Sequence, residues 1–309
     1  MRELSRKIVV LVSAIFLSIS MISASYADGH KKILFSIKGP GSGNPFWASV
    51  TKGAEEEAKK LGVKLILVAP PQEGDVQAQI NQVEDQLDKG VDALALAPGD
   101  PNAFAPIVDD AIKSGVPVVF VDTKGINEGV TFIGTNNMNG AELAAKFICD
   151  KTPKGSDVAI LTGIESQSTA LLRRDGAIKG FKNCGLNIVA TQTAEWDTAK
   201  GRSVTESIIL KNPKIKAIFA SNDNMGLGAM QALKDADMND VIVVGFDATP
   251  DAATSILKGE MTATIAQFSY NMGAYGVKYA LELANGGSID INIDTGTQLV
   301  TTANANDFK

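Results

Sequence analysis

The strongest constraint on the fold is a regular alternation of short apolar runs with segments of helical period. The apolar runs are rich in β-branched residues and lie at 32–37, 63–68, 93–97, 116–121, 158–162, 187–191, 217–221 and 241–246. They are too uniformly apolar to alternate between a buried and an exposed face, which is typical of parallel strands covered on both sides. Such strands need helices on both faces of the sheet, so the pattern predicts an α/β fold.

The segments between the runs have the spacing of amphipathic helices. In residues 44–61, apolar side chains recur every four positions from Phe46 to Ala58, and charged residues occupy much of the remaining surface. Gly62 follows at the position where glycine commonly ends a helix, and the next two helical segments also end at a glycine. This strand–helix–strand order predicts doubly wound units with right-handed crossovers.

The repeats divide into two sets, which predict two lobes. The first set ends near residue 121, the second runs from about 132 to 246, and each is the size of one domain. We expect the last block, 261–309, to return to the first lobe and then cross back, so that three strands join the lobes as a hinge. The predicted layout is a signal peptide at 1–27, an N-terminal lobe of 28–134 plus 268–296, and a C-terminal lobe of 135–267 plus 297–309.

The N-terminal segment has the order of parts found in secretory signal peptides. It opens with three basic residues, Arg2, Arg6 and Lys7. An apolar run over 8–22 follows, and then small residues that include Ser25 and Ala27. This order predicts export with cleavage after Ala27. The alternative, a membrane anchor, is disfavoured because the run is shorter than the ~20 residues of a membrane span.

The charge balance excludes one class of partner. The full chain carries a formal net charge of −6, and removal of residues 1–27 would make it more negative. An acidic surface repels phosphate backbones and anionic membranes. We therefore expect no nucleic acid partner.

Cysteine and histidine are scarce. Cys149 and Cys184 are the two cysteines, and an exported protein could keep a disulfide between them; the alternative is two separate buried thiols. The one histidine, His30, follows the predicted cleavage site in a polar segment. A Ser-His-Asp or Cys-His mechanism therefore lacks a base, and no Cys/His cluster offers a transition-metal site. We expect a protein that is not an enzyme and has no cofactor.

Polar and aromatic residues stand where the predicted strands end. In open parallel sheets, ligands bind beyond the carboxyl ends of the strands. The residues there are Lys38, Asn44, Phe46, Trp47, Asp122, Asn222, Asp223, Asp247 and Gln267. Carboxylates and amides satisfy paired hydroxyl groups, and aromatic rings cover apolar C–H faces, so the set suits a saccharide. The alternative is helix capping by the Asp and Asn residues, with the aromatics in the core.

Several of these residues belong to segments that resemble a known family. The segments are Asn44-Pro45-Phe46-Trp47, Val121-Asp122, Ser221-Asn222-Asp223-Asn224-Met225, 245–251 and 262–267. In this order they resemble the ABC-transporter periplasmic sugar-binding proteins of type I, in the ribose/galactose/allose cluster. The segment 73–79 and Lys38 are most similar to the D-allose-binding branch. The resemblance implies two doubly wound parallel-sheet lobes joined by a three-strand hinge.

The resemblance also implies a role for each site residue of the first lobe. Phe46 and Trp47 would stack on the sugar ring, and Asn44, Lys38 and Asp122 would bond its hydroxyls. The second lobe would supply an arginine clamp, an opposing aromatic wall and further amides and carboxylates: Arg174 (with Arg173 as the other candidate), Trp196, Asn222, Asp247 and, at the hinge, Gln267. Two features depart from the family pattern: Thr123 stands where relatives have a longer charged residue, and the turn at 39–43 is longer than usual.

The implied function is periplasmic binding of a monosaccharide, either a pentose or a hexose, or of a polyol. The protein would act as a monomer that delivers its ligand to the permease of an ABC importer, with a chemoreceptor as a further candidate partner. The alternative is a sensor for a signalling furanone or a chemoreceptor ligand. A dinucleotide-binding enzyme is disfavoured because the second predicted strand ends Val68-Ala69-Pro70-Pro71, without the acid that holds a ribose. A ligand-sensing repressor would carry a basic helix-turn-helix where this chain has the signal segment.

Overall fold

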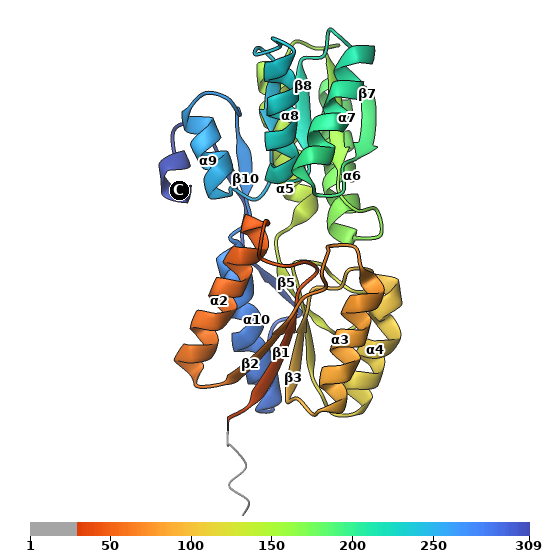
Figure 1. Ribbon diagram of the computed structural model, residues 1–309, viewed down its shortest axis with the longest axis vertical. Coiled ribbons are helices and arrows are strands. Elements are labelled where there is room, and N and C mark those ends of the chain that lie inside the picture. The colour runs from red at the N-terminus through yellow and green to blue at the C-terminus, as the bar shows by residue number, and fades with distance from the viewer. Residues whose placement is uncertain (1–29) are drawn as a thin grey trace, which may run out of the picture. The chain divides into compact units, whose positions relative to one another are not determined.

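Parallel strands form two separate sheets, one in each of two lobes (Figure 1). The computed structural model describes residues 30–309, and the predicted signal peptide and its cleavage after Ala27 lie outside the described residues. Lys31–Lys309 form one compact unit. The expected fold class, α/β with two doubly wound parallel-sheet lobes, is confirmed.

The N-terminal lobe is built on a six-stranded sheet in the order β11-β5-β4-β3-β1-β2. All neighbouring pairs in this sheet are parallel. The strands are β1 (Lys32–Ser36), β2 (Lys64–Val68), β3 (Ala93–Leu96), β4 (Val118–Val121), β5 (Thr131–Gly134) and β11 (Asn292–Asp294). The helices of this lobe are α2 (Pro45–Leu61), α3 (Val76–Asp88), α4 (Pro101–Lys113) and α10 (Ser269–Ala284).

The C-terminal lobe is built on a four-stranded parallel sheet in the order β7-β6-β8-β9. Its strands are β6 (Asp157–Thr162), β7 (Asn187–Thr193), β8 (Ala217–Ala220) and β9 (Ile242–Val244). Its helices are α5 (Asn137–Lys151), α6 (Ser168–Cys184), α7 (Thr198–Lys211), α8 (Asp223–Asp235) and α9 (Pro250–Leu257). An antiparallel pair, β10 (Thr264–Ala266) and β12 (Gln298–Val300), lies beside β9 through isolated bridges, and a short 3₁₀ helix, Ala305–Phe308, ends the chain.

Both faces of each sheet are buried, which explains the uniformly apolar runs. Along β1, Ile33 and Phe35 face a core with α2 and α10, whereas Leu34 faces a second core with α3 and α4. Along β6, Ile160 faces α5 and α6, whereas Leu161 faces the core that contains α7, α8 and α9. Successive residues of a strand point to opposite faces, so a strand covered on both sides must be apolar at every position.

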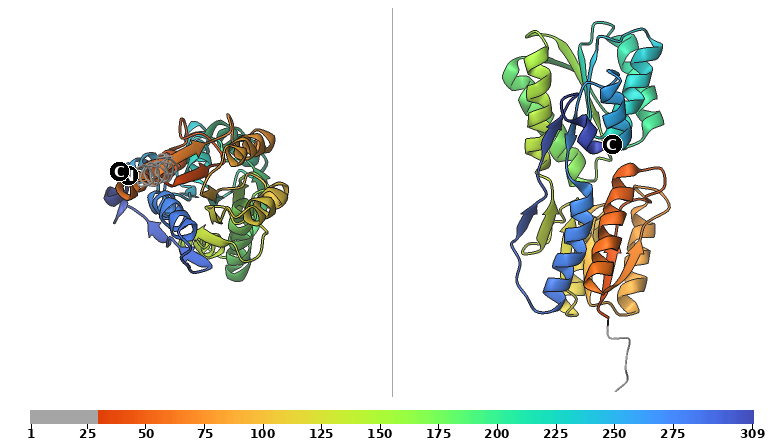
Figure 2. Two further views of the ribbon diagram at one scale, coloured as in Figure 1. Left: turned by 90° about the horizontal axis from the view of Figure 1, so that it is seen from below. Right: turned by 90° about the vertical axis from the view of Figure 1, so that its left-hand side faces the viewer.

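Two glycines allow α2 and α10 to lie against each other (Figure 2, right). A Cβ atom on Gly53 would lie 2.0 Å from the carbonyl oxygen of Tyr270, and one on Gly273 would lie 1.9 Å from that of Val50. Those distances are far below van der Waals contact, so any side chain at either position would push the helices apart. The close approach brings α10, from the last part of the chain, onto the sheet of the first lobe.

The chain passes between the lobes three times, after β5, after β10 and after β11. Hydrogen bonds connect the three crossings, because threonine hydroxyl groups of two of them donate to the carbonyl oxygen of Gln267 in the third. Thr135 Oγ1 donates to that oxygen at 3.2 Å and Thr295 Oγ1 donates at 3.1 Å. This arrangement is the three-strand hinge that was expected.

A disulfide joins Cys149 to Cys184. The sequence had left open the choice between this bridge and two separate thiols. The disulfide connects the C-terminal ends of α5 and α6, which pack side by side on one face of the second sheet. Among residues 30–309, no helix combines the length and the apolar character needed to cross a membrane.

Removing this disulfide is expected to destabilise the protein. The bridge closes a loop with a sequence separation of 35 residues. Loss of such a cross-link typically lowers the free energy of unfolding by about 2–4 kcal/mol. Urea unfolding of the double variant Cys149→Ala/Cys184→Ala, followed by circular dichroism, measures this change. A midpoint equal to that of the oxidised wild type would show that the bridge does not stabilise the lobe.

Candidate functional site

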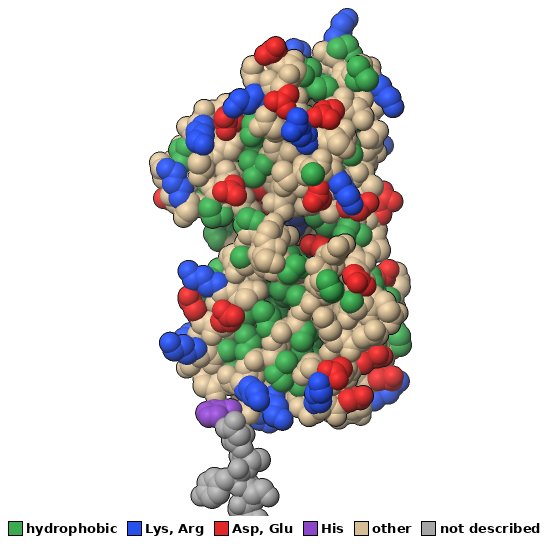
Figure 3. Space-filling view, in the orientation of Figure 1, with side chains coloured by type: hydrophobic (Ala, Val, Ile, Leu, Met, Phe, Trp, Pro, Cys, Tyr) green, Lys and Arg blue, Asp and Glu red, His purple; other side chains and the backbone are tan. Residues whose placement is uncertain are grey.

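A cavity opens between the carboxyl ends of the strands of the two sheets, where the surface is hollowed between the lobes (Figure 3). The cavity itself is narrow, about 30 Å³, and the region that includes its open mouth amounts to about 290 Å³. Its lining comprises Lys38, Asn44, Phe46, Trp47, Glu73 and Asp122 before the first crossing, and Thr169, Arg173, Trp196, Asn222, Asp247 and Gln267 beyond it. Nine of the ten residues proposed from the sequence therefore lie at one cavity.

Lys38, just beyond β1, is a buried cation in the wall of the N-terminal lobe. Its Nζ donates to Thr123 Oγ1 and to Gln167 Oε1, both at 2.8 Å, and forms an ion pair with Asp122 Oδ2 at 3.0 Å. Thr123 Oγ1 in turn donates to Asp122 Oδ2 at 2.7 Å. Glu73 Oε1 lies 3.7 Å away, so four oxygen atoms surround the ammonium group and offset its loss of hydration. Thr123, although it departs from the family pattern, joins Lys38 to Asp122.

The aromatic part of this wall begins helix α2. Asn44 is the N-cap of α2, and its side chain accepts a hydrogen bond from the backbone N–H of Phe46 at 3.1 Å. The rings of Phe46 and Trp47 meet edge to face, with centroids 4.9 Å apart. Trp47 Nε1 donates to Glu73 Oε2 at 3.0 Å. Asn44 therefore both caps α2 and lines the cavity.

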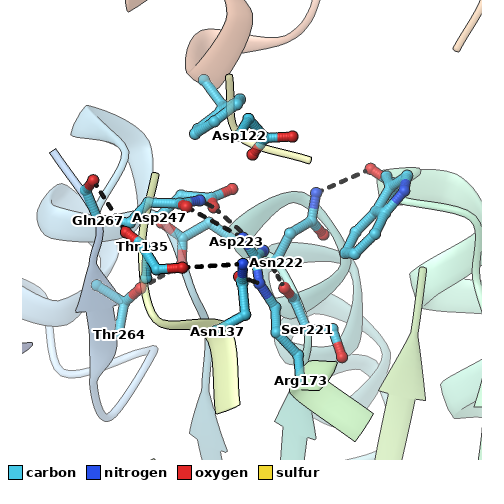
Figure 4. Close-up of polar contacts among 12 residues, drawn as sticks. Asp122, Thr135, Asn137, Arg173, Ser221, Asn222, Asp223, Asp247, Thr264 and Gln267 are labelled. Carbon is cyan, nitrogen blue, oxygen red and sulfur yellow. Dashed lines mark hydrogen bonds and ion pairs between the residues drawn. The ribbon is translucent and has the colours of Figure 1, made fainter. Parts of the chain in front are cut away.

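Arg173 is the central cation of the opposite wall (Figure 4). It is 3% exposed, and its three nitrogens donate to Asn137 Oδ1 (2.7 Å), the carbonyl oxygen of Ser221 (2.8 Å) and Gln267 Oε1 (3.1 Å). Asp247 Oδ1 lies 3.6 Å from Nη1 and also accepts a hydrogen bond from Gln267 Nε2. The planar guanidinium group thereby joins side chains and one backbone carbonyl group from the hinge and from the ends of two strands.

The prediction that Arg174 lines the cavity is wrong. Arg174 is not among the lining side chains, and its Nε donates to Asp175 at 2.8 Å on the half-exposed side of α6. Successive residues of a helix point about 100° apart, so only one of two adjacent arginines can face the cavity. The structure gives that place to Arg173, the other candidate.

Trp196 and Asn222 complete the wall of the C-terminal lobe. Trp196 Nε1 donates to Gln167 Oε1 at 2.8 Å, and Asn222 Nδ2 donates to the carbonyl oxygen of Trp196 at 3.2 Å. Asn222 is also the N-cap of α8, where its Oδ1 accepts from the N–H of Met225 at 2.9 Å. Capping and cavity lining are thus combined in one residue, as they are in Asn44.

Three lining residues have a left-handed backbone. The φ angles are 61° at Asp122, 65° at Trp196 and 127° at Asp247. Such conformations cost a non-glycine residue about 1–3 kcal/mol and cluster at ligand sites. The surrounding hydrogen bonds hold these side chains at the cavity despite that cost.

Burial changes the acid–base properties behind the cavity. It raises the pKa of Asp223 to about 7, although hydrogen bonds from Thr264 and Thr249 oppose the rise. Burial also raises the pKa of Asp247 well above its ordinary value, with the charge of Arg173 acting in the opposite direction. Burial lowers the pKa of Arg173, and the charge of Asp247 acts in the opposite direction. The ionisation of each of these three groups therefore depends on the charges of the others in one buried network.

One buried hydroxyl at the cavity has no partner. Thr169 is 2% exposed, and its Oγ1 makes no hydrogen bond within residues 30–309. A buried polar atom without a partner is costly, so a ligand hydroxyl near it would be stabilising.

Sequence reasoning missed two lining residues, Glu73 and Thr169, and it missed Gln167, which bonds to the lining residues Lys38 and Trp196. Glu73 belonged to a segment noted only for its family likeness, and Gln167 and Thr169 lie at the start of α6, away from any conspicuous motif. A search of every strand-to-helix loop for polar residues would have included them. No group of three or more His, Cys, Asp or Glu side chains in the described part of the chain is arranged to hold a metal ion.

The substitution Asp223→Asn is expected to stabilise the protein more at pH 8 than at pH 5. Because the pKa rises from an ordinary 3.8 to about 7 on folding, the stability that Asp223 provides is fully present below pH 3.8 and is lost as the pH rises through about 7. Asparagine can still accept from the N–H of Thr249 and donate to Thr264 Oγ1, without burying a charge. Thermal unfolding at both pH values measures the difference.

The exposed Asp251, on α9, provides the control. The variant Asp251→Asn should show no comparable dependence on pH. An equal effect of Asp223→Asn at pH 5 and pH 8 would contradict a raised pKa at this position.

The geometry can be compared with that of known proteins. The model of the periplasmic binding protein domain matches residues 35–288. The ribose import binding protein of Bacillus subtilis (strain 168) is 37% identical over 259 residues, which are 84% of this chain and 84% of that protein. The D-allose-binding periplasmic protein of Escherichia coli (strain K12) is 36% identical over 258 residues, which are 80% of this chain and 83% of that protein.

A solved structure extends the likeness to three dimensions. The crystal structure of an ABC transporter periplasmic solute-binding protein from Actinobacillus succinogenes 130z, with bound D-allose, has a TM-score of 0.85 and 31% sequence identity, and it covers 90% of this chain and 100% of that chain. Sequence and fold thus agree over nearly all of the described residues. The chain belongs to the periplasmic binding protein family, with the type I fold, and is a non-enzymatic solute-binding protein.

Proposed function

We propose that the protein binds one neutral monosaccharide in the periplasm and delivers it to the membrane permease of an ABC importer. The observation that carries the proposal is the lining of the cavity, in which carboxylates, amides and tryptophans from both lobes converge. Saccharides need paired hydrogen-bonding groups and aromatic surface together.

The charges around the cavity favour a neutral ligand. Glu73, Asp122 and Asp247 supply three carboxylates, and Lys38 and Arg173 supply two cations. Each cation already lies beside a carboxylate of its own wall. A sugar phosphate or a sugar acid would add a further negative charge to this set and be repelled.

Unused hydrogen-bonding capacity at the cavity matches hydroxyl groups. Asp122 Oδ1 and Asp247 Oδ2 accept no hydrogen bond from residues 30–309, and the contacts of both residues involve the other carboxylate oxygen. Arg173 uses three of the five N–H groups of a guanidinium in its hydrogen bonds. A vicinal diol can donate to a carboxylate and accept from an arginine at the same time, so these groups are suited to hold one sugar.

Trp47 and Trp196 are the proposed aromatic walls, one in each lobe. Each is almost completely buried, and each N–H group is already bonded, to Glu73 and to Gln167 respectively. The rings are therefore held in place and can cover the apolar C–H faces of a sugar without reorganising.

The relatives support a pentose or a hexose as the ligand class. One is named for ribose, another for D-allose, and the solved structure holds D-allose. The name of the first, a ribose import binding protein, favours transport over the alternative role of a sensor. We further propose that the signal peptide is removed after Ala27 and that the monomer is the active form.

Closure about the hinge would couple binding to transport. The proposed moving bodies are 28–134 plus 268–296 and 135–267 plus 297–309, with the three crossings between them. A ligand that contacts both bodies stabilises the closed form relative to an open one. The permease would then recognise the two lobe surfaces in the closed arrangement.

Isothermal titration calorimetry tests the ligand class. The panel contains D-ribose, D-allose, D-galactose and myo-inositol, with D-ribose 5-phosphate and D-gluconate as charged probes. We expect one-to-one binding of at least one neutral sugar or polyol and no measurable binding of the charged probes. Binding of an anion alone, or of none of the neutral compounds, would contradict the proposal.

The adjacent arginines form a matched pair of variants. Arg173→Lys removes the planar set of donors from the cavity wall, so the affinity for the sugar should fall at least roughly tenfold. Arg174→Lys makes the same chemical change outside the cavity, so the affinity should stay within about twofold of wild type. Calorimetry of both variants makes the comparison, and similar losses in both would remove Arg173 from the proposed site.

A further inference from the structure

The loop of residues 163–168, between β6 and the first turn of α6, reaches across from the C-terminal lobe to the N-terminal lobe. In Figure 1 it lies below the α6 label, next to the loops above α3. Ser166 Oγ donates to the carbonyl oxygen of Gly99 at 3.3 Å, in the loop after β3. Ser168 Oγ donates to the carbonyl oxygen of Lys124 at 3.2 Å, in the loop after β4. The loop is thus bonded to the N-terminal lobe at two separate strand ends.

Gln167 adds contacts to the two remaining strand ends that face the cleft. Its Oε1 accepts from Lys38 Nζ at 2.8 Å, beyond β1, and its Nε2 lies 3.5 Å from Glu73 Oε1, beyond β2. The same Oε1 accepts from Trp196 Nε1 of its own lobe at 2.8 Å. Gln167 is completely buried, so both ends of its amide group are enclosed by partners from the two lobes.

The position of Gln167 would ordinarily serve another purpose. It is the N-cap of α6, and its side chain makes no capping hydrogen bond. Seven other helices of the described residues have an N-cap side chain that accepts from a backbone N–H: α2, α3, α4, α5, α7, α8 and α9. The longer glutamine side chain leaves its own helix without a side-chain cap and reaches the facing lobe instead.

Gln167 is also absent from the lining of the cavity. Its amide bonds to Lys38 and Trp196, which do line the cavity. Its contacts therefore connect the two walls without requiring a ligand atom between them. A group with this placement responds to closure of the lobes and not to the identity of the sugar.

We propose that residues 163–168 form a closure clasp, with Gln167 at its centre, which sets how long the closed form lasts. This inference rests on the proposed function, because the clasp acts on a closed complex with a sugar. The hydrogen bond to Lys38 is charge-assisted and buried, whereas the bonds of Ser166 and Ser168 lie nearer the rim. When the lobes separate, Lys38 keeps Asp122, Thr123 and Glu73 but loses Gln167, so opening breaks the clasp while each wall stays intact.

The clasp predicts an effect on release that is separate from capture. A sugar enters the open form, in which the clasp bonds are not made, and leaves after the closed form opens. Loss of the clasp should therefore raise the dissociation rate constant and leave the association rate constant nearly unchanged. Loss of a residue that contacts the sugar would instead weaken binding in a way that depends on which sugar is used.

Stopped-flow tryptophan fluorescence measures both rate constants. The probe is D-allose, or D-ribose if wild type binds it more tightly. The variant Gln167→Met keeps the size of the side chain and removes its polar atoms. We expect its dissociation rate constant to be roughly tenfold or more above that of wild type, with the association rate constant within about twofold. The thermal transition of the ligand-free variant should stay close to that of wild type.

Two further variants complete the experiment. Glu165→Gln, in the same loop, changes an exposed side chain that makes no hydrogen bond to the described residues and should leave both rate constants unchanged. Ser166→Ala/Ser168→Ala removes the two rim contacts and should raise the dissociation rate constant about threefold. If Gln167→Met does not fold, this double variant tests whether the clasp slows release of the sugar.

The outcomes separate the clasp from the proposed function. If wild type binds neither sugar, the proposed function fails and the clasp fails with it. The result for Gln167→Met is used if that variant folds, and the result for Ser166→Ala/Ser168→Ala is used if it does not. If wild type binds and this variant releases sugar at the wild-type rate, only the clasp is overturned. A loss of affinity that comes entirely from slower association would also overturn it, because that result indicates a damaged open site.

Discussion

Two buried cations, Lys38 and Arg173, determine how the cleft is built. A buried charge is tolerated only when it is paired and fully hydrogen-bonded. Lys38 meets this requirement through Asp122, Thr123 and Gln167, and Arg173 meets it through Asn137, Ser221, Gln267 and Asp247. Each network gathers residues from several strand ends, so the positions of the remaining polar groups follow from the need to compensate these two charges.

The two networks differ in how they relate to the lobes. The partners of Arg173 lie in the C-terminal lobe and at the crossings, so this network does not depend on contacts across the cleft. Lys38 has three partners on its own wall, Asp122, Thr123 and Glu73, and one, Gln167, across the cleft. The hinge threonines bond to the carbonyl oxygen of Gln267, whose side chain reaches Arg173 and Asp247. The hinge and the binding wall are therefore connected through one residue.

Much of the fold and most of the site could be predicted from the sequence, for physical reasons. Buried parallel strands must be apolar throughout, which made β1, β3 and β8 conspicuous, whereas β11, with the sequence Asn292-Ile293-Asp294 and exposed ends, has no such pattern and was not predicted. Parallel strands present their carboxyl ends at one edge, which brought Asp122, Asn222 and Asp247 together. The choice between Arg173 and Arg174 depends on the rotation of α6 about its axis, and its weakly amphipathic sequence does not reveal that rotation. Gln167 was missed because its role depends on how two lobes meet, which no local pattern encodes.

The central claim is that both lobes hold the same sugar molecule, and a crystal structure of the protein grown with a bound neutral monosaccharide tests it most directly. The account predicts electron density for one sugar ring between Trp47 and Trp196, with hydroxyl groups bonded to Asp122 on one side and to Arg173 and Asp247 on the other. A sugar bound to one lobe alone, or at a site away from this cavity, would contradict it.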